Sequence, residues 1–140
     1  MSETKPSLLL VDDSEDDVFF MRRALKHAGI ACPMQVVTDG QQAMNYLAGA
    51  GKYADRQSFP MPALIFLDLK LPLVGGFDVL EWMRRQPGLV DLPVVILTGS
   101  SEERDRQRAR ELGVRGYCVK PPDANMLREM VEGVALGLSP

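Results

Sequence analysis

Polar side chains follow four apolar runs of this 140-residue chain, each at the point where the run ends. The residues that follow these runs are Asp12 with Asp13, Asp68, Thr98 and Lys120. In an open parallel sheet, reactive groups gather at the carboxyl ends of the strands. The spacing therefore predicts one place where three carboxylates, a hydroxyl and an ammonium lie close together.

These residue types favour phosphoryl chemistry beside a metal ion. Neighbouring carboxylates raise one another's pKa unless a cation lies between them, and oxygen ligands without His or Cys favour magnesium. An ammonium and a hydroxyl can each donate to a phosphoryl oxygen. If the third strand lies between the first and the fourth, Asp68 lies between the metal carboxylates and the pair of Thr98 and Lys120. We therefore predict that Asp68 is a nucleophile that forms an aspartyl phosphate.

The elements that position these residues alternate between short apolar strands and longer amphipathic helices, as in repeated strand–helix–strand units. Several strands are apolar throughout, which is typical of strands covered by helices on both faces. We predict strands near 7–12, 34–38, 63–68, 93–98 and 116–120, and helices near 14–28, 40–49, 76–86, 101–112 and 123–136. The predicted fold is α/β, a flavodoxin-like, doubly wound (βα)5 sandwich whose five parallel strands have the order 2-1-3-4-5.

Local signals mark the ends of several elements. Ser14 and Asp17 fit a capping box at the start of the first helix. The chain must turn back near Gly75 and Gly76, where we expect glycine to supply backbone angles that other residues resist. The connection over 49–62 is longer than the usual loop of about 4–6 residues.

Composition narrows the class of partner and the compartment. A net charge of -3, a pI of 5.2 and only 6% aromatic residues argue against direct nucleic-acid binding. No apolar stretch could span a membrane, and the first residues lack the core of a secretion signal, so we expect a cytoplasmic protein without a membrane partner. Cys32 and Cys118 have neither disulfide nor metal-ligand spacing, which agrees with a reducing compartment.

Four segments resemble the receiver domains of response regulators, the phosphoproteins of bacterial two-component phosphorelay signal transduction. The segments are 10–13 (LVDD), 67–72 (LDLKLP), 96–99 (ILTG) and 117–121 (YCVKP). The resemblance implies that Asp68 accepts a phosphoryl group from a histidine kinase in a magnesium-dependent reaction. It implies a phospho-acceptor rather than an enzyme. The reactions that such a protein would catalyse are at most its own phosphorylation from small donors and its own dephosphorylation.

The same resemblance implies a metal ligand set. Asp13, Asp68 and the backbone carbonyl of Lys70 would bind magnesium, and Asp12 would hold the ion through water. In this family the bond between the lysine and the proline that follows it, here Pro121, is usually cis.

Further roles implied by the resemblance concern the phosphoryl group and the switch. Thr98 and Lys120 would contact the phosphoryl oxygens, and the small Gly99 would leave room for them. Thr98 and Tyr117 would form a switch pair in which the ring moves inward after the hydroxyl. Residues two places beyond the acceptor and the threonine, such as Ser100, influence the lifetime of the phosphoryl group.

The receiver pattern covers the whole chain, so we expect one domain over 1–140, with short tails at 1–6 and 137–140 and no output domain. Output would then pass through contacts with a downstream protein. The segments 51–54 (GKYA) and 68–72 (DLKLP) are similar to the small stand-alone regulators partnered with bacterial phytochrome kinases. Such regulators often form homodimers through the face made by the fourth helix, fifth strand and fifth helix.

The first predicted helix carries a candidate docking surface. Its apolar stripe should face the sheet, whereas Phe19, Phe20 and Arg23 point elsewhere. Exposed aromatics beside an arginine are typical of interface anchors, and receivers commonly bind the kinase at this helix. Packing of Phe20 against the fifth helix is the equal alternative.

Three other functions compete with the phospho-acceptor. A haloacid-dehalogenase-like phosphatase needs an aspartate two residues after its nucleophile, where Lys70 stands after Asp68. A flavodoxin-like FMN carrier needs a phosphate loop after the first strand, which is missing. An unphosphorylated receiver-like scaffold would not need the full set of site residues.

Overall fold

The computed structural model describes residues 6–137, with side chains up to Gly133. The strands are β1 (Leu8–Val11), β2 (Met34–Val37), β3 (Leu64–Leu67), β4 (Val94–Thr98) and β5 (Gly116–Val119). The helices are α1 (Glu15–His27), α2 (Gly40–Ala48), the short 3-10 helix η1 (Gly51–Ala54), α3 (Gly76–Arg84), α4 (Glu103–Glu111) and α5 (Ala124–Gly137). The order is the predicted one, with η1 added inside the long connection. The predicted tails at 1–6 and 137–140 fall largely outside the described residues.

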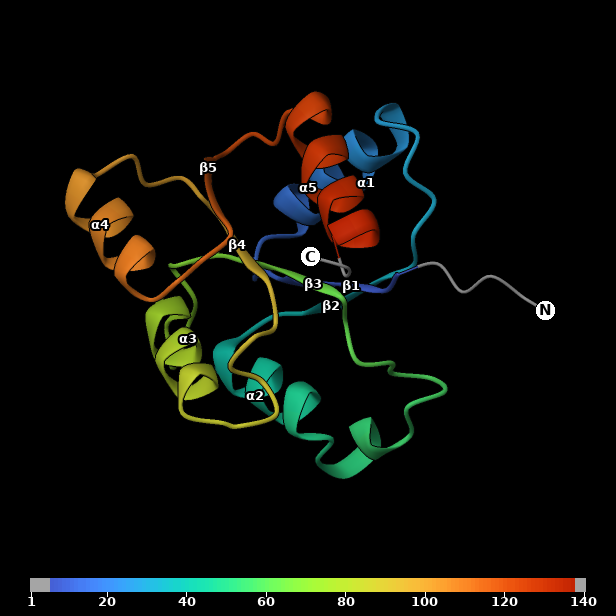
Figure 1. Ribbon diagram of the computed structural model, residues 1–140, viewed down its shortest axis with the longest axis vertical. Coiled ribbons are helices and arrows are strands. Elements are labelled where there is room, and N and C mark those ends of the chain that lie inside the picture. The colour runs from blue at the N-terminus through green and yellow to red at the C-terminus, as the bar shows by residue number, and fades with distance from the viewer. Residues whose placement is uncertain (1–5, 138–140) are drawn as a thin grey trace.

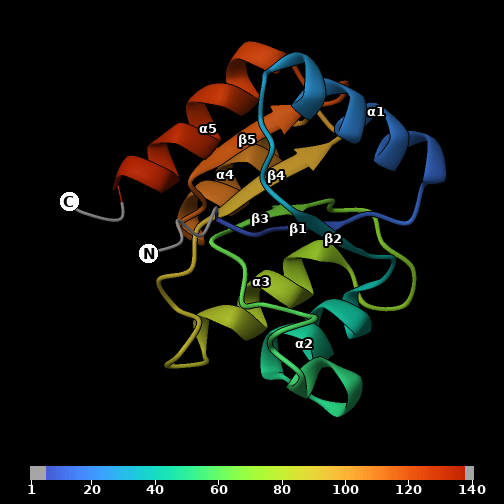
Figure 2. The same ribbon diagram turned by 90° about the vertical axis from the view of Figure 1, so that its right-hand side faces the viewer.

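The five strands pair in parallel in the predicted order β2-β1-β3-β4-β5. Helices cover both faces of the sheet, with α1 and α5 together on one side and α2 and α3 on the other (Figure 1 and Figure 2). The doubly wound α/β sandwich is therefore confirmed. Within residues 6–137, no helix combines the length and the apolar character needed to cross a bilayer.

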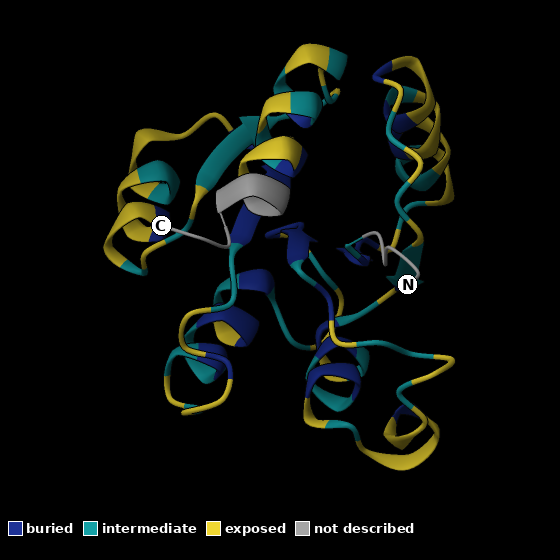
Figure 3. Ribbon diagram, turned by 45° about the vertical axis from the view of Figure 1, so that its right-hand side comes forward, coloured by how far each residue is buried: buried dark blue, intermediate teal, exposed yellow. Residues whose placement is uncertain are grey.

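Each strand supplies alternate residues to two cores, because successive side chains of a strand point to opposite faces. On β1, Leu9 and Val11 belong to the core on the side of α2 and α3, whereas Leu8 and Leu10 belong to the core on the side of α1 and α5. Both β1 and β3 are buried along their whole length (Figure 3). Burial on both faces explains why these strands are continuous apolar runs in the sequence.

The strand register aligns the ends at which the polar residues stand. Val11 pairs with Leu67, and the N–H of Asp68 donates to the Val11 carbonyl at 3.0 Å. On the other side of β3, the strands β4 and β5 end together, where the Lys120 N–H donates to the Thr98 carbonyl at 2.7 Å. The predicted polar residues therefore share one edge of the sheet.

The predicted capping box at the start of α1 is only half formed. The Ser14 hydroxyl accepts from the Asp17 N–H at 3.2 Å, as an N-cap should. The Ser14 N–H donates to the Asp12 carboxylate at 3.0 Å rather than to Asp17. The Asp17 carboxylate is therefore left for a partner outside its own helix.

The turn between β3 and α3 does not use the unusual glycine angles that we expected. Gly75 has φ -76°, and the residue with positive φ in this turn is Leu73, at 68°. Gly76 is required for space instead, because a Cβ there would lie 2.3 Å from the Asp68 carbonyl oxygen. This close approach packs the start of α3 directly against the residue predicted to be the nucleophile.

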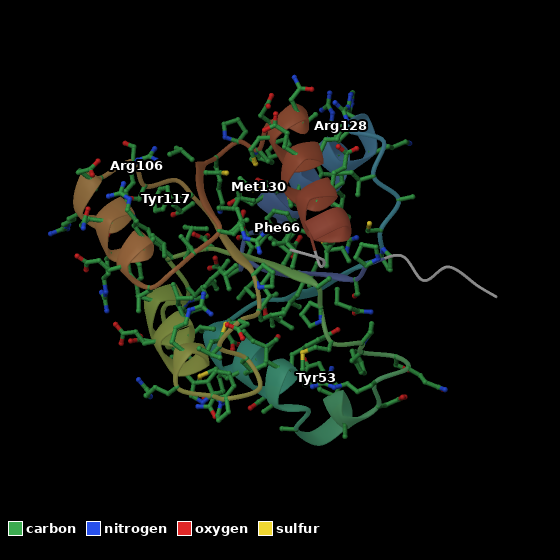
Figure 4. The ribbon with its side chains drawn as sticks, viewed as in Figure 1. Tyr53, Phe66, Arg106, Tyr117, Arg128 and Met130 are labelled. Atoms are coloured by element: carbon green, nitrogen blue, oxygen red, sulfur yellow. The ribbon has the colours of Figure 1, made fainter. Side chains whose placement is uncertain are left out.

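The long connection from α2 to β3 is a packed segment rather than an open loop. Within it, the Tyr53 ring, which is labelled in Figure 4, lies 5.0 Å from the rings of both Tyr46 and Phe59, measured between centroids. The Arg56 guanidinium donates to the Tyr46 carbonyl at the end of α2 at 2.9 Å. The Tyr46 hydroxyl donates in turn to the Pro60 carbonyl at 2.8 Å. Aromatic packing and helix-end capping thus order a segment that has little regular structure.

Replacing Gly76 with alanine should lower the free energy of unfolding by about 2–3 kcal/mol, because the added methyl group collides with backbone that cannot move aside. Gly88→Ala is the matched control, since a Cβ at Gly88 meets nothing within 4 Å. Urea denaturation of both variants checks this. Equal stability of the two variants would contradict the close approach.

Candidate functional site

The ammonium of Lys120 lies among three carboxylates at the carboxyl edge of the sheet. Its Nζ is 2.9 Å from Asp12 Oδ2, 2.9 Å from Asp68 Oδ2 and 2.7 Å from Asp17 Oδ2. The Asp12 side chain is 1% exposed and the Asp68 side chain 8%. Because buried charges need partners, this one lysine holds the ends of β1, β3 and β5 and the start of α1 together.

The structure brings Asp12, Asp68 and Lys120 together as predicted but places Asp13 outside this cluster. Asp13 is exposed and lines a surface hollow that Asp12 also borders. Sequence reasoning missed Asp17, to which the local pattern gives only a capping role. Its signal is spacing: Asp17 is the third residue of α1, and helical side chains lean toward the helix N-terminus. That direction leads back to the strand ends.

Burial sets the electrostatics of the cluster. It raises the pKa of the Asp12 carboxyl above its usual value, while the Lys120 ammonium and the Ser14 N–H lower it in part. Burial alone would lower the pKa of Lys120, but its hydrogen bonds to Asp12, Asp17 and Asp68 outweigh this and raise it above that of a free lysine. The site therefore contains a fixed positive charge at neutral pH.

The second oxygen of Asp68 faces the loop that follows β3. The Lys70 N–H donates to Asp68 Oδ1 at 3.2 Å, and the Lys70 side chain is exposed. On the neighbouring strand end, a Cβ built on Gly99 would meet no atom within 4 Å. The peptide bond between Lys120 and Pro121 is cis, as the resemblance implied.

Thr98 and Tyr117 are linked through the backbone of Ser100. Thr98 is fully buried, and its Oγ1 accepts from the Ser100 N–H at 3.3 Å. The half-buried Tyr117 donates its hydroxyl to the Ser100 carbonyl at 2.9 Å. The Arg106 guanidinium lies over the Tyr117 ring, 4.8 Å from its centroid (Figure 4). Movement of Thr98 would therefore reach the ring and α4 through one residue.

The Ser100 side chain also anchors the start of α4. Its hydroxyl donates to Asp105 at 2.7 Å and accepts from the Glu102 N–H at 3.3 Å. Because Ser100 is 7% exposed, these bonds are made away from bulk water. Sequence reasoning gave Ser100 only an influence on phosphoryl lifetime and missed this structural position.

The donor set of the site fits a hard divalent cation. Asp12 and Asp13 border one hollow, and Asp68 lies beside Asp12 across the ends of β1 and β3. All three offer carboxylate oxygens, the ligands that magnesium prefers. The Lys120 ammonium offsets only part of this negative charge.

The exposed side of α1 next to the cluster is apolar and partly hollow. Phe19 and Phe20 are 59% and 46% exposed, and their rings meet edge to face at 5.7 Å. Arg23 is exposed on the same helix. Phe20 also lines a hollow of about 240 Å³ together with Asp17 and Lys120. Of the candidate docking residues, Phe20 therefore adjoins the charged cluster.

Comparison with known proteins defines the class. A model of the response regulator receiver domain matches residues 8–132. The chain belongs to this family, whose members are phosphoryl-accepting domains of two-component signalling. The comparisons give no support to a phosphatase or to an unphosphorylated scaffold.

Some proteins that are similar to this chain are phytochrome response regulators. The response regulator Rcp1 of Synechocystis sp. is 37% identical over 127 residues, which are 91% of this chain and 84% of that protein. The structure of the phosphorylated cyanobacterial phytochrome response regulator RcpA superposes with a TM-score of 0.79 at 33% identity, covering 97% of this chain and 96% of that one. The structure of the bacteriophytochrome response regulator RtBRR superposes with a TM-score of 0.81 at 37% identity, covering 94% of this chain and 78% of that one.

Lys120→Met should lower the free energy of unfolding by about 3 kcal/mol at neutral pH, because it leaves buried carboxylates without their cation. The raised pKa means that the stabilisation by Lys120 is complete below the unfolded value of about 10.4 and is lost only as pH rises through the folded pKa. As the pH falls toward about 4 the deficit should shrink, because burial raises the pKa of the Asp12 carboxyl, which then takes up a proton and no longer needs a cation.

Urea denaturation across this pH range, in a chelator, measures the deficit. Lys70→Met is the matched control, since Lys70 has an exposed side chain and forms no ion pair among the described residues. A deficit that is the same at both pH values would contradict the pairing.

Proposed function

We propose that Asp68 accepts a phosphoryl group from a histidine kinase and that the protein signals through contacts that change with phosphorylation. The observation that supports this most directly is the Asp68 carboxylate at the end of β3, nearly buried and 2.9 Å from the Lys120 ammonium. A cation at this distance would attract the anionic phosphodonor and stabilise the charge of its phosphoryl oxygens while the carboxylate attacks phosphorus. When the carboxylate loses its negative charge on bonding to phosphorus, the negative phosphoryl oxygens would take its place as partners of the Lys120 ammonium.

In the proposed reaction an Asp68 oxygen forms a bond to phosphorus, and the bond from phosphorus to the donor breaks with its electron pair leaving on the donor. Lys120 donates to the phosphoryl oxygens and stabilises their charge. Thr98 Oγ1 accepts a bond from Ser100, so its own proton remains available for a phosphoryl oxygen. The resulting shift of Thr98 would pull on Ser100 and, through it, on Tyr117.

The proposed metal is magnesium, held by Asp13, Asp68 and the Lys70 backbone carbonyl, with Asp12 acting through water. When bound, the ion neutralises carboxylate and phosphoryl charge. A structure of Rcp1 in its Mn²⁺-bound form superposes with a TM-score of 0.74 at 36% identity, covering 92% of this chain and 91% of that one. This likeness and the oxygen donor set support a divalent ion.

The proposed partners are a phytochrome-type histidine kinase at α1, a downstream protein target and a second copy of the chain. Kinase docking would use Phe19, Phe20 and Arg23 on α1, of which Phe20 lines a hollow together with Asp17 and Lys120. A homodimer would use the face of α4, β5 and α5, where Tyr117 and Arg106 are stacked. We place these contacts in the cytoplasm and treat the chain as a single receiver domain over 1–140.

Incubation with Mg²⁺ and acetyl phosphate should add one phosphoryl group to the wild type, and Asp68→Asn should gain none, because an amide is a poor nucleophile. Intact-mass spectrometry reads the product. Asp91→Asn, an exposed aspartate in the loop before β4, is the control and should be labelled like the wild type. Labelling of Asp68→Asn, or none of the wild type, would falsify the proposal, and turnover of a free phosphate ester would favour a phosphatase.

Phe20→Ala should slow phosphoryl transfer from a bacterial phytochrome-type histidine kinase roughly tenfold, because aromatic anchors supply much of an interface's free energy. Phosphorylation by acetyl phosphate should not change, since the small donor needs no docking surface. Val90→Ala, another exposed apolar residue, is the control.

Sedimentation velocity of the same variant tests the proposed dimer face. Phosphorylated wild type and phosphorylated Phe20→Ala should form dimers equally, because Phe20 belongs to α1, which is not one of the three elements of the proposed dimer face. Loss of kinase transfer and acetyl phosphate labelling together would contradict a docking role. Loss of the dimer in Phe20→Ala would contradict the assignment of the dimer to α4, β5 and α5.

A further inference from the structure

The third carboxylate bound to Lys120 belongs to Asp17, which is outside the segments that define the receiver resemblance. Its contact with the ammonium is the shortest of the three, at 2.7 Å. Asp17 comes from α1, whereas the other two carboxylates follow strands of the sheet. Lys120 is therefore held from the helical layer as well as from the sheet.

The cation held by this trio is the lysine itself. Carboxylate oxygens of Asp12, Asp17 and Asp68 lie within 4.8 Å of one another, a spacing that also suits a metal ion. The Lys120 Nζ lies within 2.9 Å of each of them and fills the space between them. The ammonium donates hydrogen bonds to Asp17 and Asp68 and forms an ion pair with Asp12.

The proposed phosphorylation changes two of these three acceptors. Asp68 becomes an acyl phosphate, a mixed anhydride whose carboxyl oxygens carry less charge than those of a carboxylate. Asp12 would also accept a hydrogen bond from a water molecule of the proposed magnesium ion. Asp17 takes part in neither change, and its position is fixed by the helix and by the bond from its N–H to the Ser14 hydroxyl. Of the three acceptors, Asp17 alone is the same before and after transfer.

We propose that Asp17 is a positioning residue that holds the Lys120 ammonium while Asp68 exchanges its carboxylate for a phosphoryl group. The inference rests on the proposed function of Asp68. During transfer an oxygen of Asp68 bonds to phosphorus and acetate leaves acetyl phosphate with the electron pair of the broken bond. One Lys120 N–H moves from Asp68 to a phosphoryl oxygen, while the bond to Asp17 keeps the ammonium directed at the reacting group.

The test compares Asp17→Asn and Asp17→Ala with the wild type at saturating Mg²⁺ and acetyl phosphate. Asparagine keeps an oxygen acceptor without the charge, and alanine removes both. The rate of labelling should fall roughly five- to tenfold for Asp17→Asn and further for Asp17→Ala, since bonds to charged groups are the stronger ones. Magnesium affinity, measured by calorimetry, should change less than about twofold, because screened charges that do not bind the ion contribute little.

Asp16→Asn is the matched control. Asp16 is exposed in the same first turn of α1, so its replacement removes the same charge and the same favourable interaction with the helix dipole. Its carboxylate is not among the partners of Lys120. The Asp16→Asn variant should be labelled at the wild-type rate, and circular dichroism establishes that all variants are folded.

The outcomes separate this inference from the proposed function. If the wild type is labelled and Asp17→Asn is labelled as fast as Asp16→Asn, the positioning role is wrong and the phospho-acceptor stands. If Asp17→Asn weakens magnesium binding tenfold or more, Asp17 is a metal ligand and the positioning role is also wrong. If the wild type itself is not labelled, the proposed function fails first.

Discussion

Charge balance around one partly buried ammonium is the constraint on which the site depends. Lys120 pairs with carboxylates from the ends of β1 and β3 and from the first turn of α1. Without a cation, the nearly buried Asp12 and Asp68 would repel each other in a medium that screens poorly. The positions of these three carboxylates therefore depend on where β5 delivers one lysine.

The sheet makes this charge balance possible because it is buried on both faces and ends at a common edge. The apolar residues of β1 and β3 fix the register by packing into two separate cores. Gly76 lets α3 begin against the backbone of Asp68, so the backbone of the proposed phospho-acceptor is packed against the start of a helix. Ser100 ties Thr98, Tyr117 and the start of α4 together, so a change at the edge has a path to the surface.

Local patterns predicted the elements and their order because the spacing of apolar residues along the sequence differs between strands and helices. They failed where a group chooses between a local and a distant partner. Ser14 and Asp17 have the spacing of a capping box, but the Asp17 carboxylate binds Lys120, 103 positions along the chain. Gly76 was expected for its backbone freedom, whereas the structure requires it for a close approach to Asp68.

The sequence by itself determined the fold class, the strand ends and the identity of Asp12, Asp68, Thr98 and Lys120 as residues of one edge. It could do so because apolar runs and the polar residues that end them are contiguous along the chain. Only the tertiary structure decided that Asp17 joins the cluster and that Asp13 stays exposed outside it. The physical reason is that one flexible lysine side chain selects its partners by distance across the folded sheet, and no local pattern encodes that distance.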